Sequence, residues 1–311
     1  MSDYIIAEGI VKRFAEHTAL DHVSICVPEG KAFGLIGPNG AGKTTLIRII
    51  NHITVADEGS VTFDGHLLCE ADMMRIGYLP EERGLYKKMK VGEQAVYLAR
   101  LKGLSERDAK QRLKYWFEKF DIMPWWHRKL EELSKGMQQK VQFITTVLHE
   151  PPLLIFDEPF SGFDPVNAEL LKREILELRD KGHTILFSTH NMASVEELCD
   201  SIALINHSKV VLQGTVETTR AQYKDDRLKR VTIPDSSPIP PDLKVVNSEI
   251  SHGRRCLTVE KPAGETNSAF LTRIGQQTEI LAFDELLPSM NDIFLRVVGK
   301  EQDQQLNTTE Q

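Results

Sequence analysis

The feature that most constrains this chain is a glycine-rich octapeptide, Gly37 to Thr44, which fits the pattern GxxxxGK[ST]. It follows an apolar run, Ala32 to Ile36, and precedes a second one, Thr45 to Ile50, so the local order reads as strand, turn and helix. Glycines let successive backbone N–H groups turn inward around phosphate oxygens, and the helix adds the positive end of its dipole. The octapeptide therefore predicts a nucleotide phosphate site. An ordinary glycine-rich turn or a dinucleotide loop would not call for the Lys-Thr pair.

Other short apolar runs alternate with helical patterns, which indicates an α/β fold with parallel strands buried on both faces. We expect these strands at Ile76 to Leu79, Leu153 to Phe156 and Thr184 to Ser188. The long stretch between the first two is rich in Leu, Lys, Glu and Gln, which favours helix. It predicts a helical subdomain, at about 85–150, inserted into the sheet domain.

The composition changes after this domain, which we expect to span 1–220. Residues 231–246 contain four prolines, too many for a helix or a central strand. Farther on, strands are expected at Cys256 to Val259 and Glu279 to Phe283, and helices at Asn267 to Gly275 and Ser289 to Val298. The sequence thus predicts a small α+β domain over 221–299, followed by a polar, disordered tail over 300–311.

Charge and composition exclude several classes of protein. The net charge of −7 gives no global reason to bind nucleic acid. No window approaches the roughly 18 continuous apolar residues of a spanning helix, and acidic Asp3 and Glu8 argue against a signal peptide. The four cysteines form no CxxC pair, which is typical of reduced thiols. We expect a cytoplasmic or membrane-peripheral protein.

A second chemical signal lies where the apolar run Leu153 to Phe156 ends in two carboxylates, Asp157 and Glu158. A buried strand that ends in acids needs a counter-charge, which a Mg²⁺–nucleotide complex provides. We expect Asp157 to hold Mg²⁺ together with the Thr44 hydroxyl, and Lys43 to reach the β- and γ-phosphates. Glu158 would polarise the attacking water. A strand that simply ends in solvated acids is the alternative.

Further motifs narrow the class, because their order along the chain resembles that of the ATP-binding-cassette ATPases. Leu133 to Gln138, LSKGMQ, looks like the family's LSGGQ signature, and Phe160 to Pro165 looks like its D-loop. Ser188 to His190 resembles the switch histidine segment, Gly77 to Glu81 resembles the Q-loop, and Phe14 falls where the family carries an adenine-stacking aromatic. The resemblance covers residues from about 5 to 215 and implies a P-loop NTPase fold.

The resemblance implies ATP and Mg²⁺ as cofactors, with the following site residues. Nucleotide contacts are implied for Phe14, Gly37, Pro38, Asn39, Gly40, Ala41, Gly42, Lys43, Thr44, Thr45, Ser134, Gly136 and Asp164. Metal ligands are implied at Thr44, Glu81 and Asp157, and catalytic roles at Lys43, Glu158 and His190. Two alternatives stay open, since Phe14 is nearly as typical of a core aromatic and a lone histidine at a strand end is often structural.

The family also implies partners. Ser134 can cap the helix Lys135 to His149, whose N-terminus then points outward at a γ-phosphate held by the opposite subunit. Two ATP-binding subunits, as a homodimer or heterodimer, would close on two ATP molecules and drive a membrane-spanning permease. By the same resemblance the permease docks near 82–91, which puts the protein on the inner face of the cell membrane. No nucleic acid partner is expected.

Some residues depart from the family pattern. Glu81 stands where most relatives have glutamine, and Lys135 and Met137 replace a glycine and a glutamine of the signature. The segments LSKGMQQK and PEERGLY, with the C-terminal SMNDIFLRVVGK, resemble a subgroup of sodium- and drug-exporting ATPases. The sequence therefore favours an exporter subunit. The rival function is a soluble nucleotide switch acting on a non-transport partner, while a small-molecule kinase would not account for the signature and D-loop.

Overall fold

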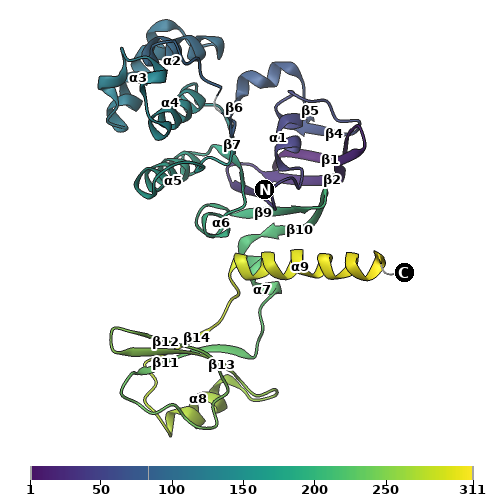
Figure 1. Ribbon diagram of the computed structural model, residues 1–311, viewed down its shortest axis with the longest axis vertical. Coiled ribbons are helices and arrows are strands. Elements are labelled where there is room, and N and C mark those ends of the chain that lie inside the picture. The colour runs from purple at the N-terminus through teal and green to yellow at the C-terminus, as the bar shows by residue number, and fades with distance from the viewer. Residues whose placement is uncertain (1, 83, 310–311) are drawn as a thin grey trace. The chain divides into compact units, whose positions relative to one another are not determined.

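The computed structural model describes residues 2–82 and 84–309 and divides into two compact units, Met1–Val216 and Glu217–Gln311 (Figure 1). Each unit has its own apolar core. Within the described residues, no helix is both long enough and apolar enough to cross a membrane.

The first unit is built on a six-stranded sheet that matches the predicted α/β class. Five strands run parallel and β10 is antiparallel to its neighbour. The order across the sheet is β10 (Lys209–Thr215), β9 (Ser201–Asn206), β3 (Ala32–Ile36), β8 (Thr184–Thr189), β7 (Leu153–Asp157) and β6 (Ile76–Leu79). Every residue of β3, β7 and β8 is buried, as parallel strands covered on both faces require. Helices α5 (Pro165–Asp180) and α6 (Met192–Leu198) complete the βα units after β7 and β8.

A second, antiparallel sheet belongs to the same unit and was not among the sequence predictions. Its order is β2 (His17–Pro28), β1 (Asp3–Phe14), β4 (Glu58–Phe63) and β5 (His66–Leu67), followed by the 3₁₀ helix η1 (Glu70–Arg75). Helix α1 (Lys43–Ile50) shares one apolar core with strands of both sheets. The phosphate-loop helix is therefore held rigidly between them.

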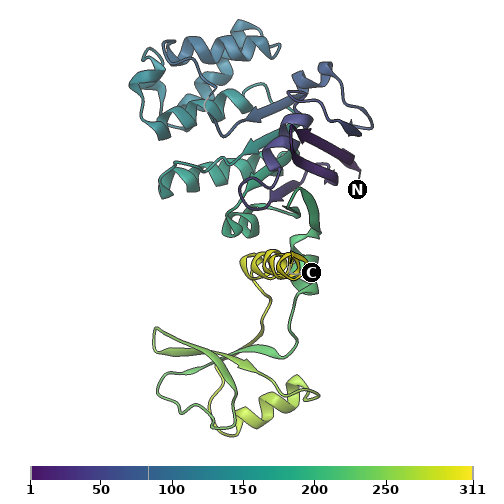
Figure 2. The same ribbon diagram turned by 45° about the vertical axis from the view of Figure 1, so that its right-hand side comes forward.

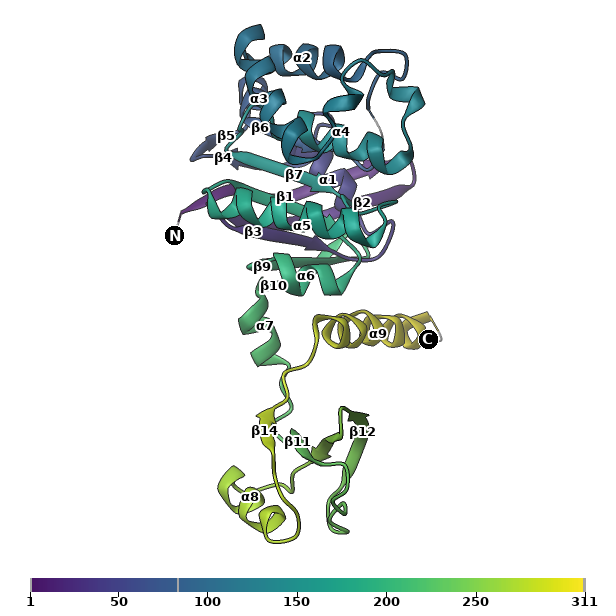
Figure 3. The same ribbon diagram turned by 90° about the vertical axis from the view of Figure 1, so that its left-hand side faces the viewer.

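The predicted helical subdomain lies between β6 and β7 and contains α2 (Val91–Leu101), α3 (Glu106–Lys119) and α4 (Lys135–Val147) (Figure 3). Two short 3₁₀ helices, η2 (Met123–Trp125) and η3 (Leu130–Glu132), precede α4. Phe143 of α4 packs edge-on against Trp116 of α3, with ring centroids 6.1 Å apart, and lies 5.7 Å from Phe156 of β7. These rings join the inserted helices to the central sheet.

The second unit has the predicted α+β composition. Its antiparallel sheet has the order β12 (Val245–Ser251), β13 (Arg254–Glu260), β11 (Leu228–Pro234) and β14 (Ala282–Glu285). Helix α8 (Asn267–Gly275) lies across one face of this sheet (Figure 2) and buries Phe270 and Ile274 against it. Helices α7 (Val216–Gln222) and α9 (Met290–Thr309) come before and after these elements in the chain.

Two expectations for this unit were wrong. Strand β11 pairs with both β13 and β14, so it is a central strand although residues 231–246 were expected to exclude one. The reason is that Pro234 is its last residue and the other prolines fall in the loop beyond, where no ladder N–H is needed. The polar tail, expected to be disordered over 300–311, instead continues α9 to Thr309. No glycine or proline interrupts the helix after Gly299, which is the physical reason that it can continue. Residues 310–311 lie outside the described part of the chain.

Candidate nucleotide site

The glycine-rich loop between β3 and α1 forms one wall of a cavity of about 350 Å³. Strand ends, the loop after β6 and the loop after β8 supply the rest of the lining. The lining residues are Phe14, His17, Ala19, Asn39, Gly40, Gly42, Lys43, Thr44, Thr45, Glu81, Glu158, Ser161 and His190. The structure thus brings together most of the predicted nucleotide, metal and catalytic residues.

Two glycines of the loop are required by its shape. Gly37 has φ 150° and a Cβ there would overlap the carbonyl oxygen of Ile205; Gly42 has φ 112° and a Cβ there would overlap that of Ala19. Both positions combine a backbone conformation that favours glycine with direct packing against another strand. Pro38 and Ala41 shape the same loop without lining the cavity. The loop is therefore fixed in its turn before any ligand binds.

Lys43, the first residue of α1, lies at the centre of the loop. Its Nζ donates to the carbonyl oxygens of Gly37, at 2.7 Å, and Pro38, at 3.0 Å. Burial lowers the pKa of Lys43, and the nearby carboxylates of Glu158, Asp157 and Glu81 oppose that shift. A buried ammonium group in this position is a counter-charge for an anion in the loop.

Asp157, at the end of β7, is almost fully buried and its two oxygens have different environments. Its Oδ1 accepts from the Ser188 hydroxyl and, at 3.5 Å, from the Thr44 hydroxyl. Its Oδ2 is buried and has no hydrogen-bond partner among the described residues. An orphaned carboxylate oxygen beside a threonine hydroxyl fits a hard divalent cation, since Mg²⁺ binds oxygen donors. Thr44 and Asp157, with Glu81 on the opposite wall, could hold one.

Glu158 and His190 form a pair at the cavity wall. His190 Nδ1 lies 2.8 Å from Glu158 Oε1, and the Glu158 side chain is only 13% exposed. Glu158 has φ 48°, a left-handed conformation that costs free energy in a non-glycine residue. Its backbone N–H donates to Ser188 Oγ at 3.1 Å and to Ser188 O at 3.2 Å, which holds it in place. The strained backbone turns this carboxylate toward the cavity.

Ser188 is a residue whose role the sequence reasoning missed. Its hydroxyl donates to Asp157 and accepts from the backbone N–H of Glu158, so one side chain of β8 positions both the last residue of β7 and the acid that follows it. The register of the parallel sheet places Ser188 opposite Asp157. That pairing depends on strand order, which the motif pattern alone does not give.

Phe14 is 49% exposed at the end of β1, so the alternative that it is a core aromatic is wrong. It pairs with His17 across the β1–β2 hairpin, and both residues line the cavity. Lys12 lies 5.4 Å from the centroid of the Phe14 ring. An accessible aromatic face at this point could stack on a nucleobase. The contribution of His17 was not predicted.

Besides Gly37, Pro38 and Ala41 of the loop itself, three predicted nucleotide-binding residues do not line this cavity. Ser134 caps α4, as predicted, by accepting from the Met137 N–H at 3.3 Å, and it is exposed. A Cβ on Gly136 would meet nothing within 4 Å, so the first turn of α4 faces open space. Asp164 caps α5 by accepting from the N–H groups that follow it. The first turns of α4 and α5 therefore lie outside the lining of this cavity.

The Q-loop is tied to the helical subdomain. Gln142 of α4 donates to the carbonyl oxygens of Pro80 and Glu82, at 3.3 and 3.4 Å, and Thr146 donates to Tyr78 O at 3.4 Å. Beside these contacts is a second cavity of about 310 Å³ with a mainly apolar lining. It is lined by Tyr78, Pro80, Gly84, Leu85, Leu98, Leu101, Lys102, Gln142, Thr145, Thr146 and His149.

Both units match known protein families. The family model described as "ABC transporter" matches residues 20–161, and the model described as "ATP-binding protein DrrA1-3-like, C-terminal domain" matches residues 214–298. The first match lies within the first compact unit, and the second begins three residues before the second unit and ends within it. The chain therefore resembles known proteins in its accessory unit as well as in its cassette.

Individual relatives extend this likeness over almost the whole chain. The "Uncharacterized ABC transporter ATP-binding protein YhaQ" of Bacillus subtilis is 42% identical over 94% of this chain and 97% of its own length. "ABC transporter ATP-binding protein NatA" of Bacillus subtilis is 33% identical over 68% of this chain and 88% of its own. "Daunorubicin resistance ATP-binding protein DrrA3" of Streptomyces coeruleorubidus is 27% identical over 96% of both.

A solved structure agrees in fold. The "Structure of ATP binding subunit of ABC transporter" superposes with a TM-score of 0.65 and 33% sequence identity, over 71% of this chain and 93% of the other. Its coverage corresponds to the first unit in extent. The architecture of the cassette is thus the one seen in such subunits.

Proposed function

The chain belongs to the ATP-binding-cassette family, as the ATP-binding subunit whose ATP hydrolysis is coupled to transport, and we propose that it powers export through a separate membrane permease. Two cassettes close on two ATP molecules and open after hydrolysis. ATP acts as a ligand of the closed state, so its binding and loss shift the equilibrium between the two states.

Within each site the residues have distinct roles. The phosphate loop and Lys43 bind the β- and γ-phosphates, and Phe14 stacks on the adenine. Thr44, Asp157 and Glu81 would hold Mg²⁺, whose charge would offset that of the phosphates. Glu158 accepts a proton from the attacking water, and His190 positions both Glu158 and the γ-phosphate. The 2.8 Å contact between His190 and Glu158 supports this pairing.

The observation that carries the two-cassette mechanism is the separation of Ser134 and Gly136 from the cavity of their own chain. The exposed N-terminus of α4 offers free N–H groups and a positive dipole end to an anion. A second cassette, facing the first, supplies that anion as the γ-phosphate of its own ATP.

The direction of transport is inferred from the relatives. The relatives include a daunorubicin resistance protein, a lantibiotic transport protein and a linearmycin resistance protein, and the C-terminal unit matches the DrrA-type domain. Removal of toxic compounds from a cell is the common theme. We infer that this chain acts from the inner face of the membrane on an outward-moving solute.

The apolar cavity beside the Q-loop is the proposed docking place of the permease. It adjoins residues of 82–91 and carries exposed apolar surface at Leu101 and Tyr86 nearby. Because Gln142 and Thr146 link its wall to the Q-loop, movement at Glu81 reaches a partner seated there. Nucleotide state and permease are thus coupled through a short, continuous set of contacts.

The function is tested by reconstituting the chain in lipid vesicles with a candidate membrane permease from the same genome. We expect ATP-dependent accumulation of a drug-like cation or of Na⁺ inside inverted vesicles, abolished by Glu158→Gln in otherwise identical vesicles. ATP hydrolysis without any solute movement, or binding to ribosomes or nucleic acid instead of membranes, would favour the nucleotide-switch alternative.

A further inference from the structure

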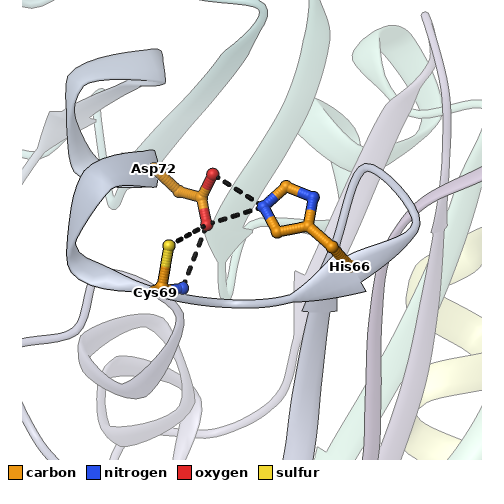
Figure 4. Close-up of side chains that lie close together, drawn as sticks. All are labelled: His66, Cys69 and Asp72. Atoms are coloured by element: carbon orange, nitrogen blue, oxygen red, sulfur yellow. Dashed lines mark hydrogen bonds and ion pairs between the residues drawn. The ribbon is translucent and has the colours of Figure 1, made fainter.

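Three side chains with metal-binding groups lie together at the end of β5 and the start of η1 (Figure 4). They are His66, Cys69 and Asp72, none of which lines the nucleotide cavity. We propose that they bind a borderline divalent transition metal ion, of which Zn²⁺ is the type, and leave one coordination position open to solvent.

The three ligand groups already point toward one another (Figure 4). His66 Nε2 lies 2.9 and 3.1 Å from the two oxygens of Asp72, and Cys69 Sγ lies 3.3 Å from Asp72 Oδ2. One ligand atom from each residue lies within 4.8 Å of the others. Among the described residues, this is the single group of three or more such side chains that meets this distance.

These separations are close to those of a tetrahedral zinc site. Bonds of about 2.0–2.3 Å to N, O and S place neighbouring ligand atoms about 3.3–3.6 Å apart. The nitrogen–oxygen pair needs to open by a few tenths of an ångström. A rotation of the His66 side chain can supply this movement, since His66 and Cys69 are exposed while Asp72 is buried.

The buried member is fixed independently of the His66 ring. Asp72 Oδ2 accepts from the backbone N–H of Cys69 at 3.0 Å, which caps η1. The Cys69 side chain completes this capping box by accepting from the backbone N–H of Asp72, so the cap accounts for Cys69 and Asp72 but not for the position of the His66 ring. The His66 ring packs edge-on against Phe63, with centroids 6.0 Å apart, which limits its orientation. A fixed carboxylate and an oriented ring are the supporting shell that metal ligands require.

The donor set decides which ion fits. One sulfur, one imidazole nitrogen and one carboxylate oxygen suit Zn²⁺ or a neighbouring transition metal and do not suit Mg²⁺, which demands oxygen ligands. On binding, the Cys69 thiol gives its proton to solvent and its thiolate sulfur bonds the metal. His66 uses the lone pair of Nε2 and keeps its proton on Nδ1. The site therefore differs in chemistry from the Mg²⁺ that accompanies ATP.

A bound ion would link the edge strand β5 to η1 and so stabilise the segment that leads to the Q-loop. Helix η1 leads directly into β6, whose end carries that loop. Lys102, which follows the last residue of α2, donates to the carbonyl oxygens of Met73 and Ile76, at 2.6 and 2.9 Å, so the helical subdomain touches the same segment. Metal occupancy thus stiffens a segment between the antiparallel sheet and the helical subdomain.

Cobalt titration of the full-length, reduced, nucleotide-free protein tests the site. Co²⁺ replaces Zn²⁺ at such sites, and only a thiolate ligand gives a sulfur-to-cobalt charge-transfer absorption. We expect this absorption to saturate at one Co²⁺ per chain and to be displaced by Zn²⁺. It should disappear in Cys69→Ser and persist in Cys256→Ser, a matched change at a cysteine outside the cluster.

The affinity for Zn²⁺ and the effect of Zn²⁺ on thermal stability give a second readout. A purely structural helix cap would produce neither. His66→Gln and Asp72→Asn, which keep hydrogen-bonding groups, should each weaken Zn²⁺ binding by at least about tenfold. Zn²⁺ should raise the melting temperature of the wild type but not that of Cys69→Ser. Absence of the sulfur–cobalt absorption in the wild type, or equal absorption in Cys69→Ser, would overturn the proposal.

Discussion

Glu158 is held by three separate constraints, a left-handed backbone, two bonds from its N–H to Ser188 and a contact with His190. A strained backbone that several contacts hold in place is typical of a residue whose position matters for chemistry. Lys43, by contrast, is held by hydrogen bonds to two carbonyl oxygens of the phosphate loop. The two residues should therefore fail in different ways when replaced.

Glu158→Gln keeps the shape of the side chain but removes the proton acceptor. We expect ATP hydrolysis to fall by about 10²- to 10⁴-fold while ATP binding persists. Lys43→Ala should instead weaken ATP binding by about ten- to a hundredfold, because a charge-assisted contact to phosphate is lost. Steady-state turnover and equilibrium binding of a fluorescent ATP analogue separate the two effects.

A matched control for this comparison is Glu118→Gln, an exposed acid on α3 outside the cavity. It should leave both quantities at the wild-type level. Unchanged turnover in Glu158→Gln would remove Glu158 from the role of proton acceptor.

His149 follows α4 and lines the apolar cavity. Burial is the main cause that lowers its pKa to about 4, from an ordinary value of 6.5. The unfolded chain therefore takes up a proton below pH 6.5 that the folded chain accepts only below about pH 4. Stability is lost as the pH falls through this window, by up to about 3 kcal/mol.

His149→Gln removes this titration. Chemical unfolding at pH 7 and pH 4 should show a smaller loss of free energy of unfolding in the variant than in the wild type. An equal loss in both proteins would mean that His149 ionises as freely when folded as when unfolded.

At the scale of elements, helix α3 and helix α5 are joined by a charged cluster. Lys119 Nζ lies 2.6 Å from a carboxylate oxygen of Glu174 and 2.6 Å from one of Glu177, and it also lies over the Trp116 ring. Hydrogen bonds from Lys119 and Lys181 lower the pKa of Glu177 to about 2. Glu174 is the buried member of this cluster, and burial raises its pKa.

Lys119→Met should leave Glu174 as an uncompensated buried acid. We expect a loss of about 2–3 kcal/mol in the free energy of unfolding. Lys181→Met removes a more exposed lysine from the same Glu177 and should cost less than about 1 kcal/mol. The double variant Lys119→Met/Glu174→Leu should regain most of the loss. Equal effects of the two single lysine changes would show that burial of Glu174 is immaterial.

Elements with a strong local pattern could be predicted from the sequence. Strand β3 and the loop after it follow from an apolar run and GxxxxGK[ST], and Ser134 was identifiable as the cap of α4. Strand β1 carries Gly9 at φ 58° and several register shifts, so its alternation is broken and no period stands out. The sequence did not predict strand β11, because a proline disfavours a central strand and the sequence does not show that Pro234 is the last residue of this one. The roles of Ser188 and His17 depend on strand pairing between distant segments.

At the scale of the whole molecule, each unit folds around its own core, and the cassette contains every residue of the nucleotide cavity. The signature residues Ser134 and Gly136 nevertheless lie outside that cavity. Each reaction centre therefore needs a second ATP-binding chain, either another copy of this protein or a paralogue, to complete it.

The most direct test of this requirement is the turnover per chain of the purified protein as it is diluted, with sedimentation at the same concentrations to record its assembly. We predict that turnover falls in step with the loss of ATP-bound dimers, and that added Glu158→Gln protein, which pairs with the wild type, changes the curve. A constant turnover per chain at concentrations where every molecule is a monomer would contradict the account.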